Sequence, residues 1–543
     1  MKKITHYILL LAVLSGTACN KELNEDVRSQ VTDNYINTPT GFEDAVRASY
    51  SHIRKFYGSG ENGSSCTVFG TDEFTNGSDG SFKSMNLYDN NLNPRIATIS
   101  GLWNDMYIAI NNCNAVVSRA GEVTGMDEAL KTTRVAETRF LRAFYYFLLV
   151  QTFGPVHLTL EETLDPEFSA SRAPVAEVYQ AIIADLDFAV ANLPETATNY
   201  GRATKPAAEF LLSKVHLTRA SSAAAQPDDY TKAATLAKSV INNYSFSLLD
   251  EYARIFDQGA GEKSSEVVWS VQNSTNLQSN ETGNTLHLYF LMEYDALPGM
   301  RRDVANGRPF KRYRPTPFVL NELFDRENDS RYEADFKRVF LCNNPGTYTF
   351  NGNRVDLATG DTAIYVADRE FSPAEIAATK YAVYPPSRQN ERIFPTLTKF
   401  LDPTRLDVGQ EPGTRDFLVF RISEAYLIAA EALMYTGQTA EAATLVNAVR
   451  TRAAKPGSEA AMQITAAQLN IDFILDERAR EFLGELMRWF DLVRTKKLIE
   501  RVKKYNAQAA PNIRDFHVLR PIPQDQIDRT EGGVSAFPQN PGY

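Results

Sequence analysis

Cysteine is scarce in this chain. Its 543 residues contain four cysteines, Cys19, Cys66, Cys113 and Cys342, with no C-x-x-C pair and no nearby histidine at zinc-ligand spacing. Disulfides therefore cannot be the main scaffold, and the cysteine pattern does not predict a zinc site.

Long apolar runs and an excess of positive charge are also missing. No stretch after the N-terminus reaches the roughly 20 uncharged apolar residues that a membrane-spanning helix needs. The 57 basic and 67 acidic side chains give a net charge of -10, which repels nucleic acid and anionic lipid headgroups. We therefore expect no transmembrane helix in the mature protein and no nucleic-acid ligand.

The familiar catalytic and metal-binding motifs are absent as well. The sequence has no G-x-x-x-x-G-K-[ST], no H-E-x-x-H and no G-x-S-x-G, and its six histidines are scattered singly. The acidic residues of GSDGS and NGNRVDLATGD lack the spacing of a strong calcium loop. The sequence thus predicts no cofactor, no metal site and no catalytic residue.

The N-terminus carries an export signal. In MKKITHYILLLAVLSGTAC, two lysines precede a short apolar run and small residues that lead to Cys19. The end of this segment resembles a bacterial lipobox, in which the cysteine is lipidated, although Gly16 stands where leucine is usual; ordinary cleavage after Ala18 is the alternative. We expect a signal peptide over 1–18, lipidation at Cys19 and an acidic tether over 19–37.

Most of the remaining chain has the periodicity of amphipathic helices. Thr40 as a cap and apolar residues at helical spacing predict a first helix between Thr38 and Phe56. Further helical stripes cover 103–120, 137–154, 177–194, 205–224, 229–244 and 422–453. In the last three of these stripes, alanines fall where paired helices would approach closely, as in tetratricopeptide-type helix pairs, and Gly437 marks a turn.

A loop-rich region interrupts the helical pattern. It contains strand-like VVWSV, a hairpin-like segment over 347–366 and many Pro, Gly and Asn residues. We divide the chain into an N-terminal helical region over 38–244, a loop-rich insertion region over 245–416 and a C-terminal helical region over 417–543. The predicted fold class is mostly α, a helix-pair scaffold with loop-rich insertions and a few short strands.

The segment ERAREFLGELMRWFDLVR raises the question of catalysis. As one helix over 477–494 it would place Glu477, Glu481 and Glu485 four residues apart, close to the separation that retaining glycosidases need. Three arginines at helical distance would instead form ion pairs: Arg478 with Glu481, Arg488 with Glu485, and Arg494 with Asp491. These pairs would lower the pKa values of the carboxyl groups. We interpret the row as a structural ion network, with a helical glycoside hydrolase as the disfavoured alternative.

Aromatic and amide side chains in the loops are the candidates for ligand binding. Aromatic rings offer flat apolar faces on which a ligand can stack, while Asn, Asp and Arg hydrogen-bond its polar groups. The predicted ligand-binding residues are Phe82, Tyr88, Asp89, Asn90 and Asn91 in the first long loop, and Tyr289, Tyr294 and Arg301 in the insertion region. The alternative for each ring is that it anchors its own loop. Trp103, Trp269 and Trp489 lie in helical or strand stripes, so we expect them in the core.

Five motifs in a fixed order resemble the SusD/RagB family of surface lipoproteins. They are WNDMYIAINNCN, ETRFLRAFYYFLLVQTFGPVHL, FRISEAYLIAAEALMYTGQTAEAATLVNAVRTRA, ERAREFLGELMRWFDLVR and the terminal NPGY. The resemblance implies a SusD-like fold with four tetratricopeptide-like helix pairs, anchored by a lipid in the outer membrane and facing the cell exterior. It also implies a SusC-like TonB-dependent outer-membrane transporter as partner and an oligosaccharide as ligand. A peptide-binding RagB-like uptake protein is the alternative.

Overall fold

The computed structural model describes residues 33–543, except residues 166 and 281. The predicted signal peptide, Cys19 and most of the acidic tether lie outside the described residues. The first α-helix among the described residues, α2 (Pro39–Ser51), is capped by the side chain of Thr38, which accepts a hydrogen bond from the Gly41 N–H. The prediction of Thr40 as the cap was wrong because Pro39 occupies the first helical position, where its missing N–H is not needed, so the cap is Thr38, two residues before Thr40.

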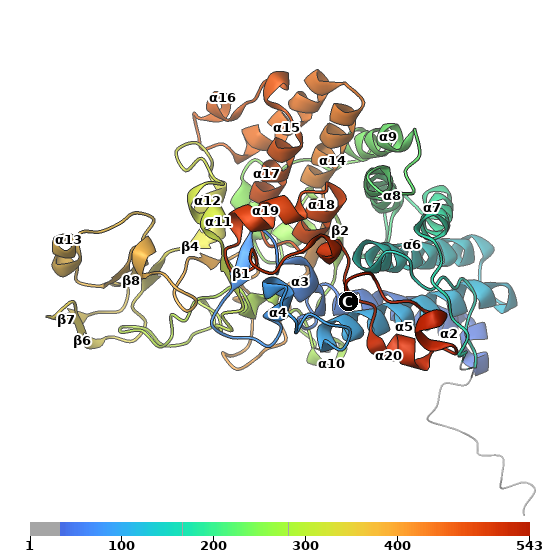
Figure 1. Ribbon diagram of the computed structural model, residues 1–543, viewed down its shortest axis with the longest axis horizontal. Helices are drawn as coiled ribbons and strands as arrows, with labels where there is room; N and C mark the ends of the chain where they lie inside the picture. Colours follow the sequence, from blue (N-terminus) through green and yellow to red (C-terminus); the bar gives the residue numbers. More distant parts are fainter. Residues whose placement is uncertain (1–32, 166, 281) are drawn as a thin grey trace, which may run out of the picture.

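Seven long helices pack in chain order to form the scaffold (Figure 1). They are α5 (Ala97–Arg119), α6 (Glu128–Phe153), α7 (Val175–Asn192), α8 (Lys205–Ala220), α9 (Asp229–Asn242), α14 (Ile422–Tyr435) and α15 (Thr439–Ala453). Each helix contacts the next, and α9 contacts α14 across the long insertion. This mostly helical arrangement of neighbouring pairs confirms the predicted fold class.

Helix α6 lies at the centre of the scaffold. Nearly all side chains from Ala136 to Phe153 are buried, on every side of the helix, which is expected only for a helix enclosed by other elements. The Asp127 side chain caps its N-terminus by accepting from the Leu130 N–H. The predicted core positions of Trp103, Trp269 and Trp489 are confirmed, since each is at most 3% exposed.

Short helices connect the scaffold and carry the loops. They are α3 (Asn62–Thr67), α4 (Ser84–Leu87), α10 (Leu277–Asn280), α11 (Pro317–Asn321), α12 (Arg331–Asp335), α13 (Pro373–Ala378), α16 (Glu459–Met462), α17 (Ile471–Glu481), α18 (Arg488–Arg494), α19 (Leu498–Tyr505) and α20 (Gln524–Arg529). Among the described residues, no helix combines the length and the apolar character that crossing a membrane requires.

The strands are short and form small sheets. They are β1 (Phe74–Asn76), β2 (Val267–Val271), β3 (Tyr313–Pro315), β4 (Phe336–Lys337), β5 (Val339–Leu341), β6 (Gly346–Phe350), β7 (Asn353–Leu357), β8 (Thr362–Val366), β9 (Ala382–Tyr384), β10 (Thr396–Leu397) and β11 (Phe417–Arg421). Antiparallel β2 and β11 pair at the two ends of the segment 272–416, which is most of the insertion region, and β1 pairs with β3, which brings the first long loop beside that region.

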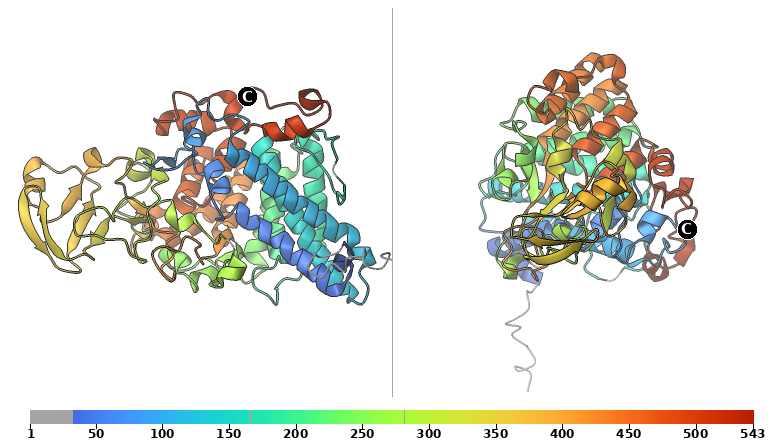
Figure 2. Two further views of the ribbon diagram at one scale, coloured as in Figure 1. Left: turned by 90° about the horizontal axis from the view of Figure 1, so that it is seen from below. Right: turned by 90° about the vertical axis from the view of Figure 1, so that its left-hand side faces the viewer.

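A lobe with its own small core projects from the helical body. Strands β5 to β9 and helix α13 form it, and Figures 1 and 2 show it extending away from the scaffold helices. Its core is separate from the main one and includes Met292, Tyr294, Phe340, Ile364 and Phe394. The insertion region is therefore more than surface loop, because part of it buries apolar side chains of its own.

The segment predicted as one helix over 477–494 is two helices joined by a turn. Helix α17 ends at Glu481 and α18 begins at Arg488. Between them Gly484 and Leu486 adopt left-handed φ values of 77° and 59°, and a Cβ on Gly484 would lie 2.9 Å from Leu397. The prediction of a continuous helix was wrong because this close approach requires a glycine with positive φ, which ends a helix.

Candidate functional site

One hollow is lined by three of the sequence-predicted ligand residues. We call it the Asn90 hollow; its volume is about 430 Å³, within the range of small-molecule sites. One wall is the loop after α4, and the other is a C-terminal segment near Asp515–Val518. The lining residues are Tyr88, Asp89, Asn90, Leu92, Asn93, Pro94, Asn512, Arg514, Phe516, His517, Gly542 and Tyr543.

Local hydrogen bonds hold the loop wall in shape. Asp89 accepts from the Asn91 N–H at 2.9 Å, and Asn93 donates to the Asn90 carbonyl oxygen at 3.1 Å. These short-range bonds make the turn that exposes the Asn90 side chain. Asn512 links the walls by donating to the Leu87 carbonyl oxygen at 3.0 Å. The Asn90 amide makes no side-chain hydrogen bond within 33–543 as described, so it can bind a ligand.

Aromatic rings line the C-terminal wall. Phe516 is partly exposed, and Tyr543 meets it edge to face with ring centroids 5.1 Å apart. Gly542 has φ of 97°, and a Cβ there would lie 2.3 Å from the Phe516 ring, so only glycine fits. The Tyr543 hydroxyl donates to the Leu519 carbonyl oxygen at 2.9 Å. This wall therefore offers part of a fixed aromatic ring to the hollow.

His517 and Arg520 determine the charge of the buried groups next to the C-terminal wall. Burial, helped by the charges of Arg520 and Arg514, lowers the pKa of His517 to about 4, so its ring is neutral at pH 7. Its Nδ1 accepts from the Arg514 N–H at 2.9 Å. Arg520 is fully buried, with its guanidinium 4.5 Å from the Trp489 ring centroid. At neutral pH the uncharged imidazole therefore forms part of the lining of the hollow and does not act as an acid.

The rings of Tyr88, Tyr289 and Tyr294 are buried, which contradicts a stacking role. They are 3%, 4% and 1% exposed. The Tyr88 hydroxyl donates to the Gly70 carbonyl oxygen at 2.7 Å, and the Tyr294 hydroxyl donates to that of Gly307 at 2.6 Å. These rings anchor their loops, the alternative that the sequence left open, because a buried hydroxyl needs a partner that fixes the ring inward.

The other predicted residues do not join the hollow. Phe82 is partly buried against the main core, and Asn91 is exposed but does not line the hollow. Arg301 is exposed beside Asn343, whose side chain accepts from the Arg301 N–H at 2.8 Å. Among the hollows described, none joins the first loop to Tyr289, Tyr294 and Arg301. The C-terminal wall was missed, since only its last residues, within NPGY, stood out in the sequence.

The predicted acid row is buried in a network of arginines. Glu481 accepts from Arg421 at 3.0 Å, from Arg331 at 3.1 Å and from Arg452, and the glutamate is fully buried. Glu477 accepts from Arg331 at 2.8 Å and from Arg450 at 2.7 Å. The predicted pairing of Asp491 with Arg494 is confirmed at 2.8 Å.

The other two predicted pairs of the row were wrong. Arg478 binds Asp491 at 2.7 Å and Glu424 at 2.8 Å, and Glu485 binds Lys399 and Arg421. The turn at Gly484 interrupts the helix that would have placed Glu485 beside Arg488, and Arg488 binds Asp72 instead. Arg478 and Glu481 share α17, but buried charges on other elements bind each of them in place of the local pair.

The charges of the network determine the ionisation of the row. Burial alone would raise the pKa of Glu481, yet the charges of Arg452, Arg421 and Arg331 together lower it to about 2. The pKa of Glu477 is likewise well below its usual range, because Arg331, Arg480 and Arg450 outweigh burial. A general acid needs a raised pKa and access to substrate, and these carboxylates have neither.

The chemistry of the Asn90 hollow is that of a binding site for hydroxylated ligands. Asp89 is the only carboxylate side chain among its lining residues, so the pair used by glycosidases is missing there. In the part of the chain that the structure describes, no group of three His, Cys, Asp or Glu residues could hold a metal ion. Asn90, Arg514, Asp89 and the Phe516 ring can donate, accept and stack.

Comparison with known families gives a direct match. Residues 265–543, about half of the chain, match the model of the SusD family. The chain belongs to the SusD family. A second family model, described as starch-binding associating with outer membrane, matches residues 26–217. The resemblance read from the five sequence motifs is confirmed.

Individual SusD relatives resemble the chain over most of its length. SusD-like protein P2 of Formosa agariphila is 26% identical and aligns over 100% of this chain and 99% of its own. The starch-binding protein SusD of Bacteroides thetaiotaomicron is 23% identical, covering 78% of this chain and 75% of its own. A laminarin-binding SusD-like protein of known structure is 25% identical, with a TM-score of 0.70 over 93% of this chain and 100% of its own.

Proposed function

We propose that this SusD-family protein captures oligosaccharides at the cell surface and delivers them to a SusC-like TonB-dependent outer-membrane transporter. The observation that carries the proposal is the likeness, over nearly the whole chain, to a laminarin-binding SusD-like protein. Membership of the family supports transport rather than cleavage, as does the burial of the acid row. We accordingly propose a binding protein without enzymatic activity.

The Asn90 hollow is the proposed binding site. A sugar ring would lie against the exposed part of Phe516, with its hydroxyl groups bound by the Asn90 amide, the Asp89 carboxylate and the Arg514 guanidinium. Arg514 uses one nitrogen for the carbonyl oxygens of Pro511 and Ile513, which leaves donors for a ligand. Tyr88 would hold the loop in place rather than contact the sugar.

We expect Asn90→Ala to weaken binding of a neutral oligosaccharide about five- to tenfold, the loss of one to two hydrogen bonds to a ligand. Calorimetry with oligosaccharides from laminarin and starch would measure it. Asn242→Ala, which removes an exposed asparagine at the end of α9, is the matched control and should bind like wild type.

The same titrations decide between sugar and peptide ligands. A peptide panel is titrated beside the glycans, and each titrated glycan is analysed for shortened products. Binding of peptides but no glycan would favour the RagB-like alternative. Shortened glycans would instead support the glycoside hydrolase alternative. Equal glycan affinities of Asn90→Ala and wild type would show that the glycan does not bind at the Asn90 hollow.

We further propose that the protein is held in the outer membrane by a lipid on Cys19, facing the cell exterior. The export signal ending in Gly-Thr-Ala-Cys supports this, and so does the outer-membrane association named in the family description. A single acyl chain anchors weakly, so several chains would be needed for stable retention.

Cys19→Ser should abolish palmitate labelling in cells and release the protein from the membrane fraction. The thiol is the atom that the lipid would join, and serine cannot replace it in that reaction. Cys66→Ser is the matched control, since Cys66 is buried and should leave labelling unchanged. Labelling that persists without Cys19 would disprove the anchor.

A further inference from the structure

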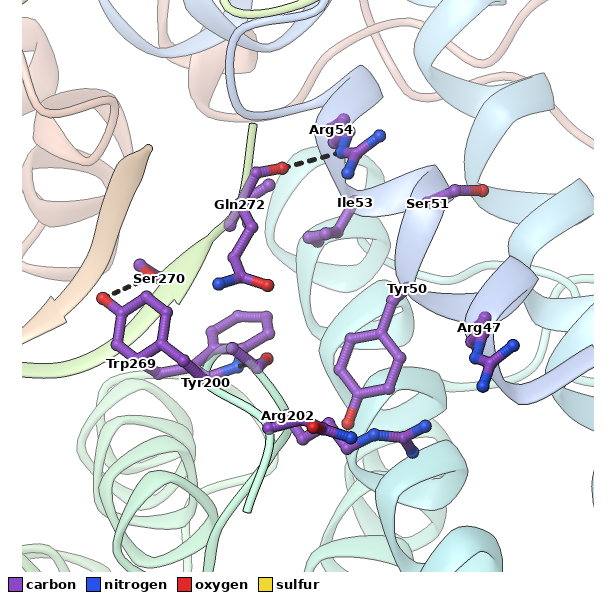
Figure 3. Close-up of a pocket in the computed structure, with 13 residues that line it drawn as sticks. Arg47, Tyr50, Ser51, Ile53, Arg54, Tyr200, Arg202, Trp269, Ser270 and Gln272 are labelled. Carbon is purple, nitrogen blue, oxygen red and sulfur yellow. Dashed lines mark hydrogen bonds between the residues drawn. The ribbon is translucent and has the colours of Figure 1, made fainter. Parts of the chain in front are cut away.

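A second hollow lies on another part of the molecule, between α2, the segment 199–202 before α8, and strand β2. We call it the Tyr200 hollow; its volume is about 280 Å³ (Figure 3). Arg47 on α2 and Arg54 in the turn just after α2 lie on one side of it, and Tyr200, Trp269 and Gln272 lie on the other. It shares no lining residue with the Asn90 hollow.

The lining of this hollow has three arginines and no carboxylate: Arg47, Arg54 and Arg202. Arg202 is already neutralised, because it binds Glu137 at 2.7 Å and Glu43 at 3.0 Å. Arg47 has only an exposed partner, Asp44 at 3.1 Å, and such surface pairs are weak and screened by salt. The α2 side of the hollow therefore carries positive charge that a ligand can use.

Arg54 adds to this charge. Its side chain donates hydrogen bonds to the carbonyl oxygens of Gln272 at 2.9 Å and Ser279 at 3.2 Å, and among the described residues it has no ion pair with a carboxylate. Burial raises the pKa of the nearby Asp416 to about 7, and the charge of Arg54 opposes this rise. Because no carboxylate pairs with Arg54 directly among the described residues, its charge adds to that of Arg47.

Groups that bind sugars lie opposite the arginines. Tyr200 is 38% exposed, so part of its ring is accessible, and its hydroxyl is held by donating to the Glu262 carbonyl oxygen and by a 3.0 Å bond from Ser270. The side-chain amides of Asn199 and Gln272 make no hydrogen bond to any described residue. A ring, two free amides and two guanidinium groups are the side chains that recognise a charged sugar.

We propose that the Tyr200 hollow is a second binding site, for a sugar unit that carries a carboxylate or sulfate group. The sugar ring stacks on Tyr200, its hydroxyl groups bind Asn199 and Gln272, and its anionic group binds Arg47, while Arg54 adds positive charge to the site. The site is independent of the proposed site at Asn90. Its volume admits one or two sugar units rather than a long chain.

The test is calorimetry of the whole protein with three probes: an oligogalacturonate, a sulfated galactan oligosaccharide and a neutral galactan oligosaccharide. We expect at least one acidic probe to bind more tightly than the neutral probe, and its affinity to fall as salt rises. Arg47→Gln should weaken that binding about tenfold, the loss of one charge-assisted contact. Arg47 is an exposed helix residue, so its replacement should leave the fold intact.

Arg354→Gln is the matched control. It removes the same charge from exposed strand β7 in the projecting lobe, and binding should not change. The acidic probe that binds identifies the anionic group as carboxylate or sulfate. Tyr200→Ala serves as a second variant and should weaken binding of the same probe without changing the salt dependence.

Cross-testing separates this inference from the proposed function. Asn90→Ala should leave acidic-sugar binding unchanged, and Arg47→Gln should leave neutral-sugar binding at the Asn90 hollow unchanged. The second site is disproved if wild type binds neither acidic probe, or if Asn90→Ala but not Arg47→Gln weakens their binding. A failure of neutral binding alone would count against the proposed function and not against this site.

Discussion

Glu481→Gln should destabilise the protein by about 3 to 5 kcal/mol without abolishing any reaction. The Glu481 carboxylate holds Arg331, Arg421 and Arg452 together in a site with no access to water, and glutamine cannot balance their charge. Removing one partner from a buried ion network leaves the others uncompensated. Urea denaturation followed by circular dichroism would measure the loss.

The matched control is Glu500→Gln on α19. Its side chain is 64% exposed and pairs with Lys497 at the surface, so the change in stability should be within about 0.5 kcal/mol. A Glu481→Gln protein as stable as wild type would contradict the structural role of the acid row. A stable variant that had lost a hydrolytic activity would make the row catalytic after all.

The destabilisation by Glu481→Gln should depend on pH with a definite sign. The pKa of Glu481 is lowered from 4.5 to about 2, so its stabilising contribution is complete above pH 4.5 and is lost as pH falls through about 2. Wild type and Glu481→Gln should therefore differ most near neutral pH and converge in acid. A difference that grew in acid would contradict the lowered pKa.

Tyr294→Ala should destabilise the projecting lobe by about 3 to 5 kcal/mol, as large-to-small changes in cores do. The Tyr294 ring is 1% exposed and lies stacked on Phe340, with centroids 5.4 Å apart, in the small second core. A cavity in so small a core cannot close by rearrangement of many neighbours. Denaturation together with limited proteolysis of the lobe would detect the loss.

Tyr294→Phe is the control for the ring itself. It keeps the packing and removes only the hydroxyl that donates to Gly307, so the loss should be about 1 kcal/mol. Neutral oligosaccharide binding at the Asn90 hollow should survive in Tyr294→Phe. If Tyr294→Ala were as stable as wild type but bound glycan more weakly, Tyr294 would be a ligand residue, as the sequence first suggested.

The helical scaffold was predictable from sequence because its signals are local. The stripe within 137–154 has apolar residues at the 3.6-residue spacing of a helix, and α6 covers it as far as Phe153. The turn at Gly484 was not predictable in the same way. A single glycine in a strong helical pattern is tolerated in most helices, and only its close approach to Leu397 shows why this one ends a helix.

The ion pairs and the site depended on contacts between remote segments. Asp491 and Arg494 are three residues apart on one helix, and their pairing could be predicted. Glu481 instead meets Arg331 and Arg421, which lie far from it in sequence, so no spacing rule could find them. The same holds for Asn90, which faces a wall made of residues between Asn512 and Tyr543, more than 400 positions away in sequence.

The burial of the tyrosines was undecidable from sequence for a related reason. A tyrosine in a loop can stack on a ligand or fold back on its scaffold, and composition does not distinguish these. The left-handed φ of Tyr88, 53°, and its hydroxyl bond to Gly70 place the ring inward. The backbone angle and the hydrogen bond exist only in the folded chain, so the sequence pattern does not reveal them.

A crystal structure of the protein with a laminarin or starch oligosaccharide would test the central claim most directly. The account predicts a sugar ring against Phe516, with hydrogen bonds to Asn90 and Arg514, in the hollow between the loop after α4 and the C-terminal wall. A ligand bound instead beside Phe82 or Arg301, with the Asn90 hollow empty, would contradict it.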